Sequence, residues 1–445
     1  MTPQPEQEQE RLSTVQLGER WSILPPEERV QGFQMMDRSE ADAFFQSRTP
    51  HGQATIVMGV PRAERRLWMR LLEPDDAADL LQEVPEEARP ELMQLLDEPT
   101  RREVSALLAY AEDEAGGLMS PRFARIRPDM TVDEAISYLR RQARNSLETL
   151  YYAYVLDREQ RLLGVVSFRE LFTAHPGQPI REVMHTDVIT VPETMDQEIV
   201  SRIVSEYDFV ALPVVDADGH MKGIITFDDV IDVVEEEATE DIHKLGGMAA
   251  LEVPYLQTGF LPMLKKRVGW LSLLFVGEMF TAAAMGHYED EIARAVVLAL
   301  FIPLIISSGG NSGSQASTLV IRAMALGEIR LRDWWHIMRR EVLSGLSQGV
   351  ILSLIAICMV GVLFWQGVFQ SHDHHVFLIA ATVASSVIGV VLWGTVAGSM
   401  LPFVLRTVRL DPASASAPLI ATLVDVSGLV IYFSMARVIL HGVLL

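Results

Sequence analysis

The sequence predicts three kinds of structure in succession: an α-helical N-domain, an α+β domain pair, and an all-α membrane domain of five helices. Three observations support this prediction. Nearly all of the net charge of −22 falls on the first 264 of the 445 residues, one pattern of about sixty residues occurs twice between positions 116 and 241, and five long apolar stretches follow position 265. We therefore divide the chain into segments 1–115, 116–180, 181–241, 242–264 (a connecting helix) and 265–445.

The charge asymmetry restricts the classes of partner. Residues 265–445 hold 12 of the 37 basic and 10 of the 59 acidic side chains, so the preceding part is strongly acidic. Such a surface repels nucleic acid and anionic lipid and attracts cations, although it can also serve solubility alone. The single cysteine, Cys358, excludes disulfides and a Cys-based zinc site. The polar N-terminus carries no signal peptide, so we expect it in the cytoplasm.

The N-domain, 1–115, shows a repeated helix-start signal. Prolines followed by polar or acidic residues occur at Pro25, Pro74, Pro85 and Pro99, and proline with carboxylates suits the free N–H groups of a first helical turn. Short apolar-periodic segments lie between these starts. We therefore expect a stack of short helices, with the Gly-containing segment 49–61 as a connection.

The repeat at 116–180 and 181–241 reads strand, helix, strand, turn, strand, helix in each copy. Its final strands, 164–168 and 223–227, share a Gly-aliphatic-aliphatic-Ser/Thr-Phe pattern, and this resembles a pair of CBS domains. That resemblance implies a cleft that binds an adenine nucleotide such as ATP, in which Thr226 and Asp229 would contact the ribose. The first copy departs from the pattern, because Glu170 replaces the aspartate after Ser167. A purely dimerising scaffold is the alternative.

The segment from Asp228 to Asp241 concentrates acidic side chains just before the first apolar stretch. Like charges at helical i,i+3 and i,i+4 spacing repel each other, and no lysine relieves this repulsion. Carboxylate oxygens are preferred ligands of Mg²⁺ and Ca²⁺, so bound divalent cations would relieve it. A solvated acidic face without a ligand is the alternative. The eight carboxylates are those of Asp228, Asp229, Asp232, Glu235, Glu236, Glu237, Glu240 and Asp241.

Each of the five apolar stretches is close to or above the ~20 residues that span a bilayer as a helix. They cover residues 268–286, 293–325, 344–369, 376–405 and 418–444. Lys and Arg occur before the first stretch and in the second–third and fourth–fifth loops, whereas the other two loops have none. By the positive-inside rule, the N-terminus lies in the cytoplasm and the C-terminus outside a cell membrane.

Asp425 in the last stretch is the most informative polar residue, because a carboxylate inside the bilayer is costly and marks a pathway. Ala421 leaves room beside it. We expect the second stretch to be interrupted at Pro303 and at 307–311, so that Gly309, Gly310 and Asn311 offer exposed carbonyls and an amide to Mg²⁺. The role of Glu278 stays open between function and a structural hydrogen bond. The loop 372–375, with three histidines and Asp373, is either a metal ligand set or only a polar loop.

Three stretches, 232–246, 309–315 and 418–432, make the chain resemble the MgtE family of magnesium transporters or channels over nearly its whole length. The resemblance implies a homodimer in a lipid bilayer, with Asp425 as its pore acid. It also implies a set of Mg²⁺-sensing ligands. These are Asp75, Asp79, Asp196, Glu198, Asp208, Asp229, Asp232, Glu237, Glu240, Asp241 and Asp411. Ala417 and Ser314 depart from the asparagines that family members can carry.

The expected function is Mg²⁺ uptake through a pore that cytosolic Mg²⁺ closes by bridging these carboxylates. A CBS-regulated transporter of an organic solute or anion is a rival, but it would favour basic groups within the membrane. A membrane receptor without flux is a second rival. No triad, phosphate loop or metal-hydrolase spacing occurs, so the sequence does not predict an enzyme. Discrimination among Mg²⁺, Mn²⁺ and Co²⁺, and channel versus carrier kinetics, do not follow from the sequence.

Overall fold

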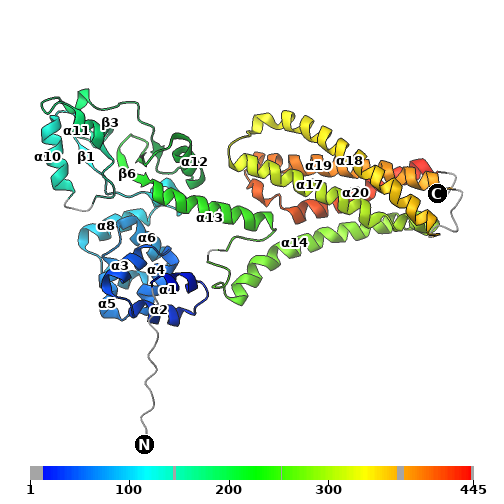
Figure 1. Ribbon diagram of the computed structural model, residues 1–445, viewed down its shortest axis with the longest axis horizontal. Helices are drawn as coiled ribbons and strands as arrows, with labels where there is room; N and C mark the ends of the chain where they lie inside the picture. Colours follow the sequence, from blue (N-terminus) through cyan, green and yellow to red (C-terminus); the bar gives the residue numbers. More distant parts are fainter. Residues whose placement is uncertain (1–13, 144–146, 252, 368–374, 442–445) are drawn as a thin grey trace, which may run out of the picture. The chain divides into compact units, whose positions relative to one another are not determined.

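A computed structural model of the protein describes residues 14–143, 147–251, 253–367 and 375–441 (Figure 1). The chain forms two compact units, Met1–Glu237 and Ala238–Leu445, which we describe separately. The predicted histidine loop lies, apart from His375, outside the described residues.

The first unit begins with a stack of short helices, as the proline signals predict. Three aromatic side chains, Phe33, Phe45 and Trp68, form its centre, with ring centroids 4.8 Å apart for Phe33 and Trp68 and 5.3 Å apart for Phe45 and Trp68. All three are buried. The helices are α1 (Thr14–Arg20), α2 (Pro26–Gln34), α3 (Arg38–Gln46), α4 (Pro50–Gly59), α5 (Arg62–Met69), α6 (Pro74–Glu83), α7 (Arg89–Met93), α8 (Glu98–Leu107) and α9 (Ala115–Leu118).

The expected connection at 49–61 is wrong, because α4 occupies Pro50–Gly59. Thr49 caps this helix by accepting a hydrogen bond from the Gly52 amide, and Pro50 stands in the first turn. Gly59 is required by packing rather than by a turn, since a Cβ atom there would lie 2.3 Å from Val30 Cγ2. The segment therefore carries a helix start, and its glycines serve close helix contacts.

The two repeats each form a small sheet in which one parallel and one antiparallel pair of strands meet, as expected for the CBS pair. The first copy contains β1 (Arg125–Ile126), α10 (Val132–Gln142), β2 (Tyr152–Leu156), β3 (Leu162–Ser167) and α11 (Phe168–Thr173), followed by the short helix η1 (Ile180–Glu182). The second contains β4 (Val191–Pro192), α12 (Gln197–Tyr207), β5 (Ala211–Val215), β6 (Met221–Thr226) and α13 (Phe227–Leu245).

Each sheet is extended by a segment of the other copy that lies before that copy's first strand. Ser120 exchanges two backbone hydrogen bonds with Ile224 of β6, and His185 exchanges two with Val165 of β3. A Cβ atom on Gly164 or Gly223 would lie 2.6 Å from the carbonyl oxygen of His185 or Ser120, respectively. The glycine of the repeated motif therefore permits this reciprocal exchange, which ties the two copies into one body.

The connecting helix expected at 242–264 is not continuous. Helix α13 starts earlier, at Phe227, runs through the acidic segment and ends at Leu245. Gly247 adopts φ +71°, a left-handed conformation that ends a helix at low cost in glycine. The next helix, α14, starts only at Phe260.

The described residues of the second unit form five helices that are long and apolar enough to cross a membrane, in agreement with the predicted number and order. They run over Phe260–His287, Val296–Ala325, Leu331–Trp365, Val376–Thr407 and Ala417–Leu440. The elements are α14 (Phe260–His287), α15 (Glu289–Arg294), α16 (Val296–Ala299), α17 (Ile302–Ala325), η2 (Leu331–Asp333), α18 (Trp334–Trp365), α19 (Val376–Thr407), η4 (Pro412–Ser414) and α20 (Ala417–Leu440).

The predicted interruption of the second span at 307–311 is wrong. Helix α17 is continuous from Ile302 through Ala325, and the break lies earlier, between α16 and α17. Pro303 stands in the first turn of α17, where its missing N–H costs nothing. The glycines serve packing against α19: a Cβ atom on Gly394 would lie 2.2 Å from the Gly309 carbonyl oxygen. Small residues allow such close contact between membrane helices.

Candidate functional site

Asp425 lies on α20, in the middle of the last candidate span, and is half-buried. Ala421 precedes it by one turn on the same face. The backbone of α17 approaches α20 at this level, because the Cβ position of Gly310 lies 3.5 Å from Ala421 Cα. The structure therefore brings Ala421 and Gly310 together one turn from the carboxyl group of Asp425.

The other two residues of the predicted pore segment have different surroundings. Gly309 is buried, and its Cβ position faces Val390 of α19 and Val424 of α20. Asn311 is exposed, and its amide donates to the Ser307 hydroxyl at 3.5 Å. Because α17 is continuous here, the carbonyl groups at 309–311 belong to a helix and are not exposed as predicted. The polar group that this segment exposes is the Asn311 side chain.

Ser314 and Ala417, the two positions expected to depart from the family pattern, contact each other. The Ser314 hydroxyl donates to the backbone carbonyl of Ala417 at 3.3 Å. This contact joins α17 to the start of α20. Both positions therefore belong to one place in the fold.

Glu278 on α14 lies beside Asp425. The two carboxyl groups are close enough for a hydrogen bond when one of them is protonated. The Thr422 hydroxyl also donates to Glu278 Oε1 at 3.4 Å. Among the described residues, neither acid has an ion pair with lysine or arginine in the structure.

A second group of carboxylates, which we call the carboxylate cluster, lies within the first unit. It joins Asp75, Asp76 and Asp79 of α6 to Asp229 near the start of α13 and to Glu148, which lies between α10 and β2 of the first copy. The cluster contains three of the predicted sensing residues: Asp75, Asp79 and Asp229.

Burial and mutual repulsion shift these groups toward the protonated form. Burial, then the charges of Asp76 and Asp229, raises the pKa of Asp79 to about 8. Burial, followed by Glu148 and Asp229, raises the pKa of Asp75 well above its usual range. Burial also raises the pKa of Asp229 to about 7, although hydrogen bonds from Thr226 oppose this rise. The cluster is therefore unfavourable as a set of free anions.

Asp75 carries an oxygen atom that a bound cation would satisfy. Its side chain is buried, and among the described residues its Oδ1 atom receives no hydrogen bond. A buried carboxylate oxygen without a donor is costly, and a divalent cation would both satisfy it and cancel the repulsion. Oxygen-only ligands favour Mg²⁺ or Ca²⁺.

The remaining sensing residues of the first unit lie on other parts of the CBS pair. Asp196 caps α12, and Glu198 in the first turn pairs with Arg202 at 2.8 Å. Asp208 ends the same helix in a left-handed conformation, φ 54°. An 11-residue helix separates the two ends by about 16 Å, so Asp208 cannot share an ion with the other two in one chain. Glu237 accepts a hydrogen bond from Gln197 at 2.7 Å.

In the second unit, Lys244 connects two predicted sensing residues. Its ammonium group pairs with Glu240, one turn earlier on α13, and with Asp411 Oδ2 at 2.5 Å. Asp411 Oδ1 also caps η4 by accepting from the Ala413 amide at 2.8 Å. A lysine therefore neutralises these two carboxylates here, and Asp241 follows Glu240 on the same helix. Asp232 lies on the part of α13 that belongs to the first unit, where its charge acts on Asp76 of the carboxylate cluster.

The predicted nucleotide-contacting acid, Asp229, and its counterpart in the first copy, Glu170, are both engaged in helix caps. Asp229 Oδ2 accepts from the Thr226 amide at 3.1 Å and from its hydroxyl at 2.5 Å. In the first copy, Glu170 caps α11 through Ser167 and pairs with His185 Nε2 at 2.5 Å. Because Asp229 also belongs to the carboxylate cluster, its surroundings favour a cation over an anionic phosphate chain.

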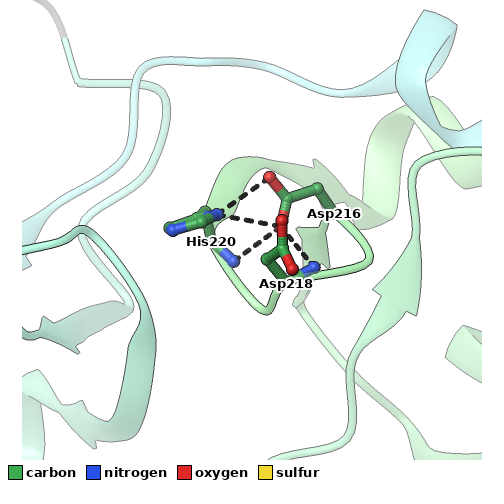
Figure 2. A group of neighbouring side chains, drawn as sticks. All are labelled: Asp216, Asp218 and His220. Atoms are coloured by element: carbon green, nitrogen blue, oxygen red, sulfur yellow. Dashed lines mark hydrogen bonds and ion pairs between the residues drawn. The ribbon is translucent and has the colours of Figure 1, made fainter.

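Asp216, Asp218 and His220 form another group with metal-like spacing, in the turn between β5 and β6 (Figure 2). Asp216 accepts from the amides of Asp218 and His220 at 3.0 and 2.9 Å, and its carboxylate pairs with Lys222 at 3.1 Å. The first copy builds the same turn around Asp157. We therefore assign this group to turn formation.

Sequence reasoning missed two acids of the cluster, Asp76 and Glu148. Asp76 stands next to Asp75 in the sequence, so the same helix-start signal could have found it. Glu148 lies in an irregular segment before β2, where its hydrogen bond from Ser120 at 3.0 Å follows from the exchange between the copies. No local sequence signal predicts that position.

Comparisons with known proteins agree with this architecture. Family models match for the MgtE intracellular N domain at residues 12–113, the CBS domain at 115–177 and 180–236, and the MgtE divalent cation transporter at 302–435. The magnesium transporter MgtE of Thermus thermophilus is 40% identical over 426 residues, covering 95% of this chain and 92% of that protein. The magnesium transporter MgtE of Bacillus subtilis is 32% identical over 390 residues, covering 88% and 84%.

A solved structure of the cytosolic domain of the Mg²⁺ channel MgtE in complex with ATP is 40% identical, with a TM-score of 0.46, covering 50% of this chain and 91% of that chain. The family is one of transporters and not of enzymes. The fold prediction is confirmed, with a helical N-domain, a CBS pair and five apolar helices in order. The chain belongs to the MgtE family of magnesium transporters.

Proposed function

We propose that this protein carries Mg²⁺ into the cell through its membrane domain and that cytosolic Mg²⁺ closes the pathway. The position of Asp425 is the observation that supports transport most strongly. A half-buried carboxyl group in the middle of an apolar span, with no lysine or arginine partner among the described residues, is expensive unless a cation passes or binds there. The named relatives are magnesium transporters, which supports Mg²⁺ as the substrate.

The carboxylate cluster supports the gating part of the proposal. Without a divalent cation, the charge of Asp229 repels both Asp75 and Asp79, which favours their protonated forms. Mg²⁺ bound among them would hold α6 near the start of α13, whose other end carries Lys244. A ligand shifts a conformational equilibrium only by its differential affinity, so the closed state must bring these carboxylates closer together than the open state.

We further propose a homodimer with the N-terminus in the cytoplasm and the C-terminus outside. Helix α14 is exposed or half-buried within one chain except at Leu274. A second copy or lipid must therefore cover this helix, and a pore between two copies would bring Asp425 into a shared pathway. The Lys and Arg bias of the loops supports the orientation.

Uptake of Mg²⁺ into proteoliposomes, followed with an enclosed fluorescent indicator, tests the assignment of Asp425. We expect Asp425→Asn to lose at least about tenfold in flux, because the neutral amide removes the charge that offsets ion dehydration. Asp290→Asn is the matched control, since Asp290 is exposed outside the candidate spans. Wild-type flux in Asp425→Asn would remove the pore assignment, and no flux in the wild type would favour the receptor alternative.

ATP binding to the CBS pair remains a prediction. Equilibrium dialysis of the full chain in detergent with radiolabelled ATP tests it. Saturable binding would support the nucleotide cleft, and its absence at millimolar ATP would leave the pair as a scaffold for the carboxylate cluster.

A further inference from the structure

Helix α14 makes a close crossing with α20 at Gly277. A Cβ atom at this position would lie 2.6 Å from Thr422 Cγ2, so the observed approach requires a residue without a side chain. Thr422 and Asp425 are three residues apart and share one face of α20. The crossing therefore places the residue after Gly277, which is Glu278, against the face that carries Asp425.

The contacts of Glu278 confirm this placement. Its Oε1 atom accepts a hydrogen bond from Thr422, and its carboxyl group adjoins that of Asp425. Two helices thus contribute one acid each to the same level of the membrane domain. Glu278 is exposed and Asp425 half-buried, so a cation can reach both within one chain.

Two ionised carboxylates side by side on neighbouring apolar spans need a positive partner. No lysine or arginine supplies it among the residues that the structure describes. A divalent cation carries the charge that matches the pair, whereas a monovalent cation leaves one negative charge uncompensated.

We propose that Glu278 is a second acidic residue of the ion pathway, which with Asp425 makes the site favour divalent over monovalent cations. This inference rests on the proposed passage of Mg²⁺ along Asp425. Gly277 is the positioning residue, because a side chain there would meet Thr422 and push Glu278 away from Asp425.

The expected effect follows from charge. A fixed negative charge interacts twice as strongly with a divalent as with a monovalent ion at the same distance. Its removal therefore weakens divalent binding more. We expect Glu278→Gln to lower the Mg²⁺ over Na⁺ permeability ratio by at least about tenfold, equivalent to about 1.4 kcal/mol.

Reversal potentials of the reconstituted full chain, with Mg²⁺ on one side of a planar bilayer and Na⁺ on the other, measure this ratio. Glu278→Asp keeps the charge and should retain most of the ratio. Glu289→Gln is the matched control, because Glu289 is exposed just beyond the end of α14. Gly277→Val should reproduce the loss with Glu278 still present, since the added side chain separates α14 from α20.

A wild-type ratio in Glu278→Gln would overturn the inference. Should that variant fail to fold, Gly277→Val decides in its place, and a wild-type ratio there would equally overturn it. If Asp425→Asn loses Mg²⁺ current while the Glu278 and Gly277 variants keep the wild-type ratio, only the role of Glu278 fails. If Asp425→Asn also conducts Mg²⁺ like the wild type, the proposed function fails with it.

Discussion

Asp79 offers a quantitative test of the carboxylate cluster. Burial and the charges of Asp76 and Asp229 raise its pKa to about 8, against 3.8 for the free side chain. At pH 7 without Mg²⁺, the unfolded chain holds Asp79 ionised, and folding must protonate it. A difference of about three pH units between pH 7 and the free pKa corresponds to about 4 kcal/mol, since one unit is worth about 1.4 kcal/mol. Asp79→Asn removes this cost.

We expect Asp79→Asn to raise the Tm of the magnesium-free protein at pH 7 by roughly 5–15 °C, from a gain of about 2–4 kcal/mol. The sign with pH follows from proton binding. The folded wild type binds more protons than the unfolded chain between about pH 4 and pH 8, so its stability falls as pH rises through this window. The variant should show a shallower fall.

Thermal unfolding of the full chain in detergent, in EDTA at pH 5, 6, 7 and 8, measures both effects. Glu86→Gln is the matched control, because Glu86 is exposed on the same helical domain. Saturating Mg²⁺ should stabilise the wild type more than Asp79→Asn. A lower Tm for Asp79→Asn in EDTA at pH 7, or an unchanged pH slope, would refute the reasoning.

Three further substitutions test separate contacts. Arg122→Ala leaves two carboxylates and a hydroxyl of the helical domain without their shared guanidinium, and unfolding should become easier by about 1–3 kcal/mol, seen as a lower Tm. Gly398→Val places a side chain 2.1 Å from a carbonyl oxygen of α17, so we expect little monodisperse protein by size-exclusion chromatography. Gly361→Val is the control and should behave as wild type, because Gly361 faces open space on α18. Lys244→Met removes the ammonium partner of Asp411, and Mg²⁺ should then stabilise the variant more than the wild type. The reason is that Mg²⁺ would take the place of the ammonium group beside Asp411. Equal Mg²⁺-dependent Tm shifts for the two proteins would contradict this.

The membrane spans were the most predictable part of the fold, because length and apolar composition are local properties. The Lys and Arg content of the loops also predicts an orientation. The position of the break in the second span, however, does not follow from the sequence. Pro303 signals a boundary, and the glycine run after it suggested a second one. These glycines instead allow α19 to pack closely against α17, with Gly394 against Gly309. No local sequence pattern predicts this tertiary contact.

The cytoplasmic part shows the same division between local and tertiary information. The repeat of the CBS pair follows from its strand patterns, whereas the exchange of Ser120 and His185 between the copies does not. Thr49 and Pro50 form a helix-start signal of the same kind as those at Pro25, Pro74, Pro85 and Pro99. The glycines nearby favour a connection instead, and the prediction from them is wrong.

The candidate sites divide similarly. Asp425 stands out because its type is rare within an apolar span, and Asp75 and Asp79 follow from the family resemblance. Glu148 joins the cluster only through folding. Glu278 was visible in the sequence, but its proximity to Asp425 depends on the crossing at Gly277.

Currents carried by Mg²⁺ in inside-out patches, with the cytosolic face exposed to varied Mg²⁺, test the central claim most directly. Wild-type protein should pass Mg²⁺ current at micromolar cytosolic Mg²⁺ and lose it reversibly at about 10 mM, the range of weak carboxylate sites. Asp425→Asn should pass little current at either concentration. A wild-type current in Asp425→Asn, or a wild-type current that is indifferent to cytosolic Mg²⁺, would contradict the account.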